Sequence, residues 1–149
     1  MSENQKQKMT FDVRSEWLSH QESVSFCETP GKSATIKLDT NLSGTPDAFN
    51  PAELLMAAIS ACMIKGIERV APMLKFSFRG IEVKLHGIRQ DAPPRMESIE
   101  YEIIIDTDEN DHRLELLHKN VKQYGTVFNT VTTGTSLFGK IVRKSAGSY

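Results

Sequence analysis

Two cysteines, Cys27 and Cys62, are the residues of this sequence best suited to covalent chemistry. A thiolate acts as a nucleophile or a metal ligand, and its surroundings decide which chemistry is open to it. Cys62 stands in the run LLMAAISACMI, residues 54–64, which only Ser60 interrupts. This apolar setting alone favours a buried, inert thiol that packs like a small hydrophobic side chain. A cation such as arginine beside it would instead stabilise the thiolate and make it reactive.

The sequence shows no residue spacing that is typical of a metal site. The acidic segment Asp106–Asp111 looks like the start of a calcium loop, which needs glycine at its sixth position and glutamate at its twelfth. Asp111 and Leu117 hold those positions, so we predict an acidic strand-to-helix turn whose carboxylates cap the helix. The histidines have no ligand spacing and are predicted to be structural surface residues: His20, His86, His112 and His118.

Motifs for hydrolysis and phosphate binding are also missing. Residues 134–139, GTSLFG, do not match G-x-S-x-G, because Phe138 stands two residues after Ser136. Neither GxxxxGK[ST] nor GxGxxG occurs. We therefore expect no cofactor and no metal ion.

Composition narrows the class of protein further. The chain has 149 residues, which suits one domain. With 18 Lys and Arg against 19 Asp and Glu, the net charge of -1 argues against nucleic-acid binding. The N-terminal MSENQKQK is not a signal peptide, and an eleven-residue apolar run is shorter than the roughly 20 residues that span a bilayer. We expect a cytoplasmic protein with reduced thiols and no membrane partner.

One long helix is predicted at the centre of the chain. Asn50 is a suitable cap, Pro51 fits the first helical position, and Glu53 completes a capping box. We expect the helix to run to about Ala71, where Pro72 stops it. Its first half is apolar on every side, which predicts a buried central helix covered by sheets or by a second subunit.

The remaining elements complete an α+β order, β-β-β-α-β-β-α-β. Residues 1–8 are predicted to be a disordered tail and 9–149 a single domain. A long connection at Gln90–Pro94 is expected to join the two strands after the central helix. Alternating apolar residues predict strands at about 9–17, 24–26, 34–38, 81–86, 99–106 and 135–143, and core spacing predicts a second helix at 111–124.

Several segments carry a resemblance to a known family. Residues 50–62 read NPAELLMAAISAC, and Pro-x-Glu-Leu-Leu followed by cysteine in the same helix is uncommon by chance. Together with Ile81–Val83, Pro93–Arg95 and Gly125–Val131, this segment resembles the OsmC/Ohr family, the osmotically inducible and organic hydroperoxide resistance proteins. The resemblance covers roughly Met9 to Val142.

The resemblance implies an intertwined homodimer and a peroxiredoxin-like role in the oxidative stress response. In catalytic members of the family a thiolate, here matching Cys62, attacks an organic hydroperoxide and becomes a sulfenic acid, which a second cysteine resolves. An arginine held by a glutamate activates the thiolate at the dimer interface. On this resemblance the catalytic candidates are Cys62, Arg14 and Glu53.

Departures from the family pattern leave two functions open. The second family cysteine falls at or beside Gly125, the glutamate of peroxidase members matches Ala52, and strand alternation places Cys27 on the face opposite Phe26. We expect thiol-dependent reduction of organic hydroperoxides through Cys62 with an external thiol as reductant. The alternative is a non-catalytic protein of this type that binds a small apolar ligand at the dimer cleft.

Overall fold

A computed structural model describes residues 8–17, 24–32 and 34–145. The chain forms two compact units, Met1–Glu53 and Leu54–Tyr149, which we describe separately. The elements are mixed α and β, with two three-stranded sheets and three helices. Within the described residues, no helix has the length and apolar composition needed to cross a membrane.

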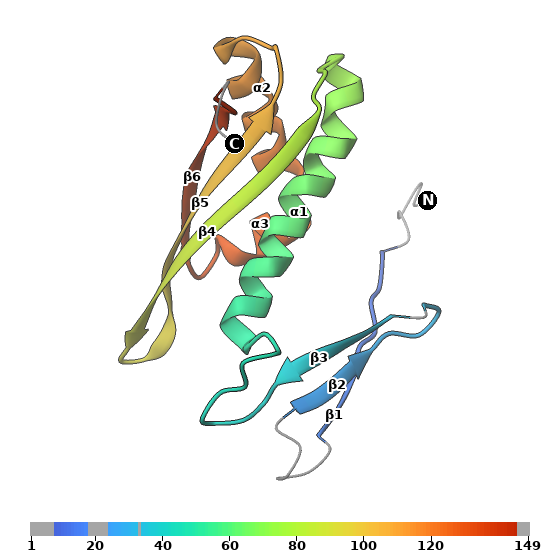
Figure 1. The fold of residues 1–149 in the computed structure, drawn as a ribbon, viewed down its shortest axis with the longest axis vertical. Helices are drawn as coiled ribbons and strands as arrows, with labels where there is room; N and C mark the ends of the chain where they lie inside the picture. The colour runs from blue at the N-terminus through green and yellow to red at the C-terminus, as the bar shows by residue number, and fades with distance from the viewer. Residues whose placement is uncertain (1–7, 18–23, 33, 146–149) are drawn as a thin grey trace, which may run out of the picture. The chain divides into compact units, whose positions relative to one another are not determined.

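The N-terminal unit holds an antiparallel sheet in the order β1-β2-β3 (Figure 1). The first strand was expected to begin at Met9, and this start is wrong. Its pairing with β2 begins only at Arg14, which lies opposite Glu28, the last residue of β2. Pro30 follows soon after β2 and has no backbone N–H to donate, so residues before Arg14 have no partner strand. The expected tail, apart from Lys8, and residues 18–23 lie outside the described residues. The strands are β1 (Arg14–Trp17), β2 (Val24–Glu28) and β3 (Thr35–Asp39).

Helix α1 (Pro51–Leu74) begins with the predicted capping box. The backbone N–H of Glu53 donates to Asn50 Oδ1 at 2.8 Å, and the backbone N–H of Asn50 donates to Glu53 Oε1 at 3.0 Å. Two N–H groups that the helix leaves without an internal partner are thereby satisfied.

The predicted stop of α1 at Pro72 is wrong, because the helix continues to Leu74. A proline near the end removes one N–H group and does not block the last turn. The helix instead ends at Lys75, which adopts a left-handed φ of 51°. The Phe76 N–H donates to Ala71 O at 2.8 Å, which satisfies a terminal carbonyl group.

The second unit is built on the sheet β4-β5-β6. Strands β4 (Gly80–Asp91) and β5 (Pro94–Asp106) form a long antiparallel hairpin, and β6 (Ser136–Arg143) pairs with β5 in parallel (Figure 1). The long connection expected at Gln90–Pro94 is wrong: both strands extend further and only two residues join them. A two-residue link is compatible with antiparallel strands, which need no crossover.

Along the chain, two helices come between β5 and β6. Helix α2 (Asp111–Tyr124) was expected, but the prediction of a carboxylate cap is wrong: the side-chain amide oxygen of Asn110 accepts the Arg113 N–H at 3.0 Å. Helix α3 (Thr126–Val131) was missed, because six residues are too few for an apolar period to be recognised.

The core of the second unit lies between one face of its sheet and the helices. Alternate residues of β5 point to this face, as the period of two requires, and the opposite face carries charged residues of all three strands, among them Lys84, Glu102 and Lys140. The buried apolar set is Ile59, Met63, Ile67, Val70, Ala71, Phe76, Ile99, Tyr101, Ile103, Ile105, Leu114, Leu117, Val121 and Phe128.

Candidate functional site

Cys62 lies in the fourth turn of α1, at the boundary between the buried and the exposed face of the helix. Its thiol is free and half-buried. Ala61 on one side is exposed, while Met63 on the other is 1% exposed. The sulfur is therefore neither sealed in the core nor fully in solvent, and a small reactant can reach such a position.

The backbone of Gly125 lies against this sulfur. A Cβ atom at position 125 would be 3.2 Å from Cys62 Sγ, 3.0 Å from Phe128 Cβ and 3.2 Å from Val121 O. These contacts are tight, whereas the φ of -80° at Gly125 suits any residue. Glycine thus allows the close approach of this backbone to the sulfur. The corner between α2 and α3 meets the sulfur because no side chain stands between them.

Helix packing and hydrogen bonds hold the corner between α2 and α3 in place. Gly66, one turn after Cys62, packs on α2: a Cβ there would be 3.2 Å from Val121 Cγ1. The backbone N–H of Asn129 donates to Gly125 O at 2.9 Å, and its side-chain Nδ2 donates to Gln123 O at 3.1 Å. Sequence patterns did not indicate these contacts, since glycine and asparagine carry no apolar period.

A polar pair, Tyr101 and His118, packs next to the corner between α2 and α3 through the ring of Phe128. Tyr101 is 2% exposed, its hydroxyl lies 2.6 Å from His118 Nε2, and its ring meets Phe128 edge-on at 6.2 Å between centroids. Burial raises the pKa of Tyr101 to about 12. Burial, with a smaller effect of Lys122, lowers the pKa of His118 to about 4. Both groups are neutral at pH 7, and the tautomer of the ring sets which of them donates the hydrogen bond. His118 is structural, as predicted, but it is half-buried rather than fully at the surface.

Arg14 and Glu53, the other two catalytic candidates, belong to the N-terminal unit. The guanidinium of Arg14 pairs with Glu16 at 2.9 Å and with Glu28 at 3.4 Å, and all three side chains are exposed. Glu53 is engaged in the capping box of α1. The catalytic roles of both residues stay predictions.

Cys27 also belongs to the N-terminal unit. It is a free, half-buried thiol on β2, where its backbone pairs with Ser15 of β1 and Ile36 of β3. Side chains directly opposite in antiparallel strands point to the same face, so Cys27 shares a face with Ile36. Its part in the chemistry of Cys62 stays open to experiment.

Two cations of α1 lie on the same side of the helix as Cys62. Lys65 and Arg69 follow Cys62 by three and seven residues, a spacing that places them on the same side of a helix. Both are exposed, and within the described chain neither is paired with a carboxylate. The positive charge nearest to Cys62 along its own helix therefore comes from these residues.

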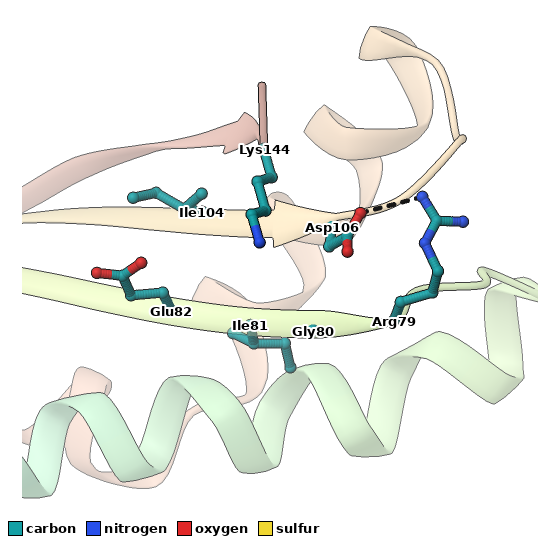
Figure 2. A pocket seen from close by; sticks show the side chains of 7 residues that line it. All are labelled: Arg79, Gly80, Ile81, Glu82, Ile104, Asp106 and Lys144. Atoms are coloured by element: carbon teal, nitrogen blue, oxygen red, sulfur yellow. Dashed lines mark hydrogen bonds and ion pairs between the residues drawn. The ribbon is translucent and has the colours of Figure 1, made fainter. Parts of the chain in front are cut away.

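A separate hollow of about 340 Å³ lies at the end of the second sheet, where β4, β5 and the residue after β6 meet (Figure 2). Arg79 binds Asp106 at 3.0 Å and Asp108 at 3.0 Å, which lowers the pKa of Asp108. Cations and carboxylates balance here, and the lining contains no nucleophile. Among the described residues, no group of His, Cys, Asp and Glu is arranged to hold a metal. The lining residues are Arg79, Gly80, Ile81, Glu82, Ile104, Asp106 and Lys144.

Comparisons with known proteins agree on one family. Residues 44–137 match the family model described as OsmC-like protein. No curated protein sequence matches. An OsmC-like protein of Mycoplasma pneumoniae is similar in fold, with a TM-score of 0.82 and 15% identity over 93% of this chain and 100% of the other.

Two further structures carry more informative names. An organic hydroperoxide resistance protein OsmC of Legionella pneumophila, also described as a predicted redox protein, has 17% identity and a TM-score of 0.69, covering 91% of this chain and 98% of its own. The organic hydroperoxide resistance protein OhrB of Bacillus subtilis has 13% identity and a TM-score of 0.62, covering 90% and 98%. At these identities the likeness shows the fold.

Proposed function

Because this chain belongs to the OsmC-like protein family, we propose that it reduces organic hydroperoxides through the thiol of Cys62, with an external thiol as reductant. The observation that carries the proposal is the position of Cys62, a free, half-buried thiol on the central helix. The names of the Legionella and Bacillus proteins of the same fold support the class of substrate.

The first step is a two-electron oxidation of sulfur. The Cys62 thiolate attacks the outer oxygen of the hydroperoxide, the O–O bond breaks, and the alkoxide leaves and takes up a proton to become an alcohol. Cys62 is then a sulfenic acid. Sulfur has lost the two electrons that the peroxide bond has gained.

In this proposal the second step uses a thiol from outside the chain. Gly125, whose Cα lies against the Cys62 sulfur, has no side chain and supplies no thiol. The other cysteine, Cys27, belongs to the N-terminal unit. An external thiol condenses with the sulfenic acid to a mixed disulfide and water, and a second thiol then releases Cys62.

We propose that the working form is a homodimer. The first half of α1 leaves apolar side chains uncovered in the single chain, among them Leu55 at 37% and Ile64 at 36% exposed, with Ala58 and Ala61 between them. A continuous apolar strip on a long helix favours burial against another protein surface. A second copy of α1 offers a self-complementary surface of the same chemistry.

The test is hydroperoxide consumption in the presence of a small thiol. Wild type and Cys27→Ser are expected to consume cumene hydroperoxide at comparable rates, whereas Cys62→Ser is expected to be inactive. Equal rates for wild type and Cys62→Ser would favour the alternative, a non-catalytic protein that binds a small apolar ligand. The hollow in Figure 2 does not favour that alternative, because most of its lining residues are charged.

A further inference from the structure

The polar pair of Tyr101 and His118 takes no part in the reaction proposed above, although it packs next to the site. The Tyr101 hydroxyl is 2.6 Å from His118 Nε2, and the tyrosine is 2% exposed. Replacing both partners of a buried hydrogen bond by apolar groups of the same shape is nearly neutral for stability in many proteins. What the polar pair adds is direction, because a satisfied buried hydrogen bond fixes the relative positions of the elements that carry it.

The sheet sets the position of the Tyr101 ring. Tyr101 of β5 stands opposite Gly139 of β6, and a Cβ at position 139 would be 2.6 Å from the ring atoms Cγ and Cδ2. The glycine therefore leaves the ring its room. From β5 the hydroxyl meets His118 of α2, and the ring meets Phe128 of α3 edge-on at 6.2 Å between centroids. One side chain of the sheet thus contacts the helices on both sides of Gly125.

Successive contacts lead from this pair to the sulfur of Cys62. The ring of Tyr101 packs on Phe128. A Cβ at Gly125 would be 3.0 Å from Phe128 Cβ and 3.2 Å from Cys62 Sγ. On the other side of the corner, His118 precedes Gly125 by about two turns of α2. A shift of either helix against β5 therefore moves the backbone that lies against the sulfur.

We propose that Tyr101 and His118 are positioning residues: their hydrogen bond holds the corner between α2 and α3 against the Cys62 sulfur, and so fixes the sulfur for attack on the hydroperoxide. The inference rests on the proposed function and adds two residues that act on the same site. The pair acts by geometry and not by charge, since both groups are neutral at pH 7. Every contact lies within the second unit, so the inference holds for the single chain and for the homodimer alike.

The first readout measures how closely the corner is held to the sulfur. In a Cys27→Ser/Gly125→Cys background, the disulfide between Cys62 and the introduced thiol is equilibrated with reduced and oxidised glutathione. The equilibrium gives the effective concentration of one thiol at the other. We expect Tyr101→Phe to lower this effective concentration by about tenfold, which corresponds to the loss of one hydrogen bond that holds the corner.

Ile105→Val is the control for a general loss of stability. It trims a fully buried side chain on the same face of β5, four residues after Tyr101. Four residues of strand span about 13 Å, so the control is expected to change the effective concentration by less than about twofold. A second pair tests the histidine. His118→Gln keeps a polar group for the Tyr101 hydroxyl and should stay within about threefold of the parent, whereas His118→Leu should behave as Tyr101→Phe.

The second readout is the rate at which cumene hydroperoxide oxidises Cys62 in the Cys27→Ser background, without a change at Gly125. Tyr101→Phe and His118→Leu are expected to slow this oxidation by about five- to tenfold, because misplacing a reacting group by about 1 Å costs up to about 100-fold in rate. The midpoint of the pH profile of the rate is expected to stay unchanged, since neither group changes charge between their pKa values of about 4 and about 12.

The proposal is overturned if Tyr101→Phe keeps either the effective concentration or the oxidation rate, or if Ile105→Val lowers both equally. A shifted pH profile, with the rate recovered at high pH, would also overturn it, because the pair would then act by charge. Should Gly125→Cys fail to fold, the oxidation rate and its pH profile decide in the same way. The proposed function fails by a different result, a Cys62 thiol of the parent that stays unchanged after treatment with hydroperoxide.

Discussion

At the scale of single residues, the candidate site is Cys62, whose sulfur lies against the backbone of Gly125. Cys62 is half-buried at the edge between the two faces of α1, and the tight corner of α2 and α3 closes on it at Gly125. Gly125 has no side chain to cover the sulfur, so one side of the sulfur stays exposed. Gly125 also supplies no thiol, and the second unit contains no other cysteine. Reaction with external molecules is the chemistry that this arrangement allows.

A cysteine at position 125 is predicted to form a disulfide with Cys62. In a disulfide each Cβ lies about 3 Å from the partner's sulfur, since the S–S bond is about 2.05 Å, and a Cβ at this position is 3.2 Å from Cys62 Sγ. Mild oxidation of Gly125→Cys should lower the mass by two hydrogens and protect both thiols from alkylation. Gly125→Ser, of similar size, is the control. Free alkylation of both cysteines after oxidation would show that the close approach is wrong.

The Tyr101–His118 pair predicts a loss of stability in acid. The pKa of His118 is about 4 in the folded chain against an ordinary value of 6.5, so between these values the unfolded chain binds a proton that the folded chain does not. The free energy of unfolding should therefore fall as the pH drops from 6.5 to 4, by on the order of 1–2 kcal/mol because the ring is partly exposed.

Urea titrations at pH 7 and pH 4.5 measure this effect. His118→Gln should lose less stability on acidification than wild type, while the exposed His86→Gln should behave as wild type. An identical loss in wild type and His118→Gln would contradict the role of this histidine.

At the scale of elements, α1 positions the site, and its start depends on the capping box. Glu53→Gln keeps a side-chain oxygen that accepts the Asn50 N–H, whereas Glu53→Ala removes it. We expect Glu53→Ala to lower the free energy of unfolding by about 1 kcal/mol and Glu53→Gln by much less. Urea unfolding measures both.

The same pair of variants separates the cap from the catalytic role predicted for Glu53. If Glu53→Gln keeps its stability but loses hydroperoxide reduction, the carboxylate has a chemical role as well. If it keeps both, Glu53 acts only as a cap.

Prediction from sequence succeeded where a single physical signal dominates. Alternation located the strands that carry Ile81–Leu85 and Ile99–Ile105, and capping residues located the start of α1 at Pro51. It failed where the signal was local and weak. The helix continued through Pro72 because the last turn tolerates one missing N–H, and α3 was too short to show a period.

The site itself was only partly predictable. Cys62 was recognisable from its motif, since a cysteine follows Pro-x-Glu-Leu-Leu in the same helix. The contact between Gly125 and the sulfur and the bond between Tyr101 and His118 join distant parts of the chain, and no spacing in the sequence reports such contacts.

At the scale of the whole molecule, the proposed homodimer depends on the apolar strip of α1. Ile64 is 36% exposed in the single chain, so Ile64→Glu should allow the chain to fold while it prevents burial of the strip. We expect wild type to have the mass of a dimer in size-exclusion chromatography with light scattering, and Ile64→Glu that of a monomer. Lys84→Glu on the opposite face of the sheet serves as the control. A monomeric wild type would contradict the proposal.

The central claim, that Cys62 is the residue oxidised by an organic hydroperoxide, is tested most directly by locating the oxidised sulfur. The protein is treated with one equivalent of cumene hydroperoxide in the presence of a sulfenic-acid trap such as dimedone, digested, and mapped by mass spectrometry. We predict the adduct on the Cys62 peptide of wild type and Cys27→Ser, formed in seconds, and none in Cys62→Ser. An unmodified Cys62 peptide, or an adduct confined to Cys27, would contradict the account.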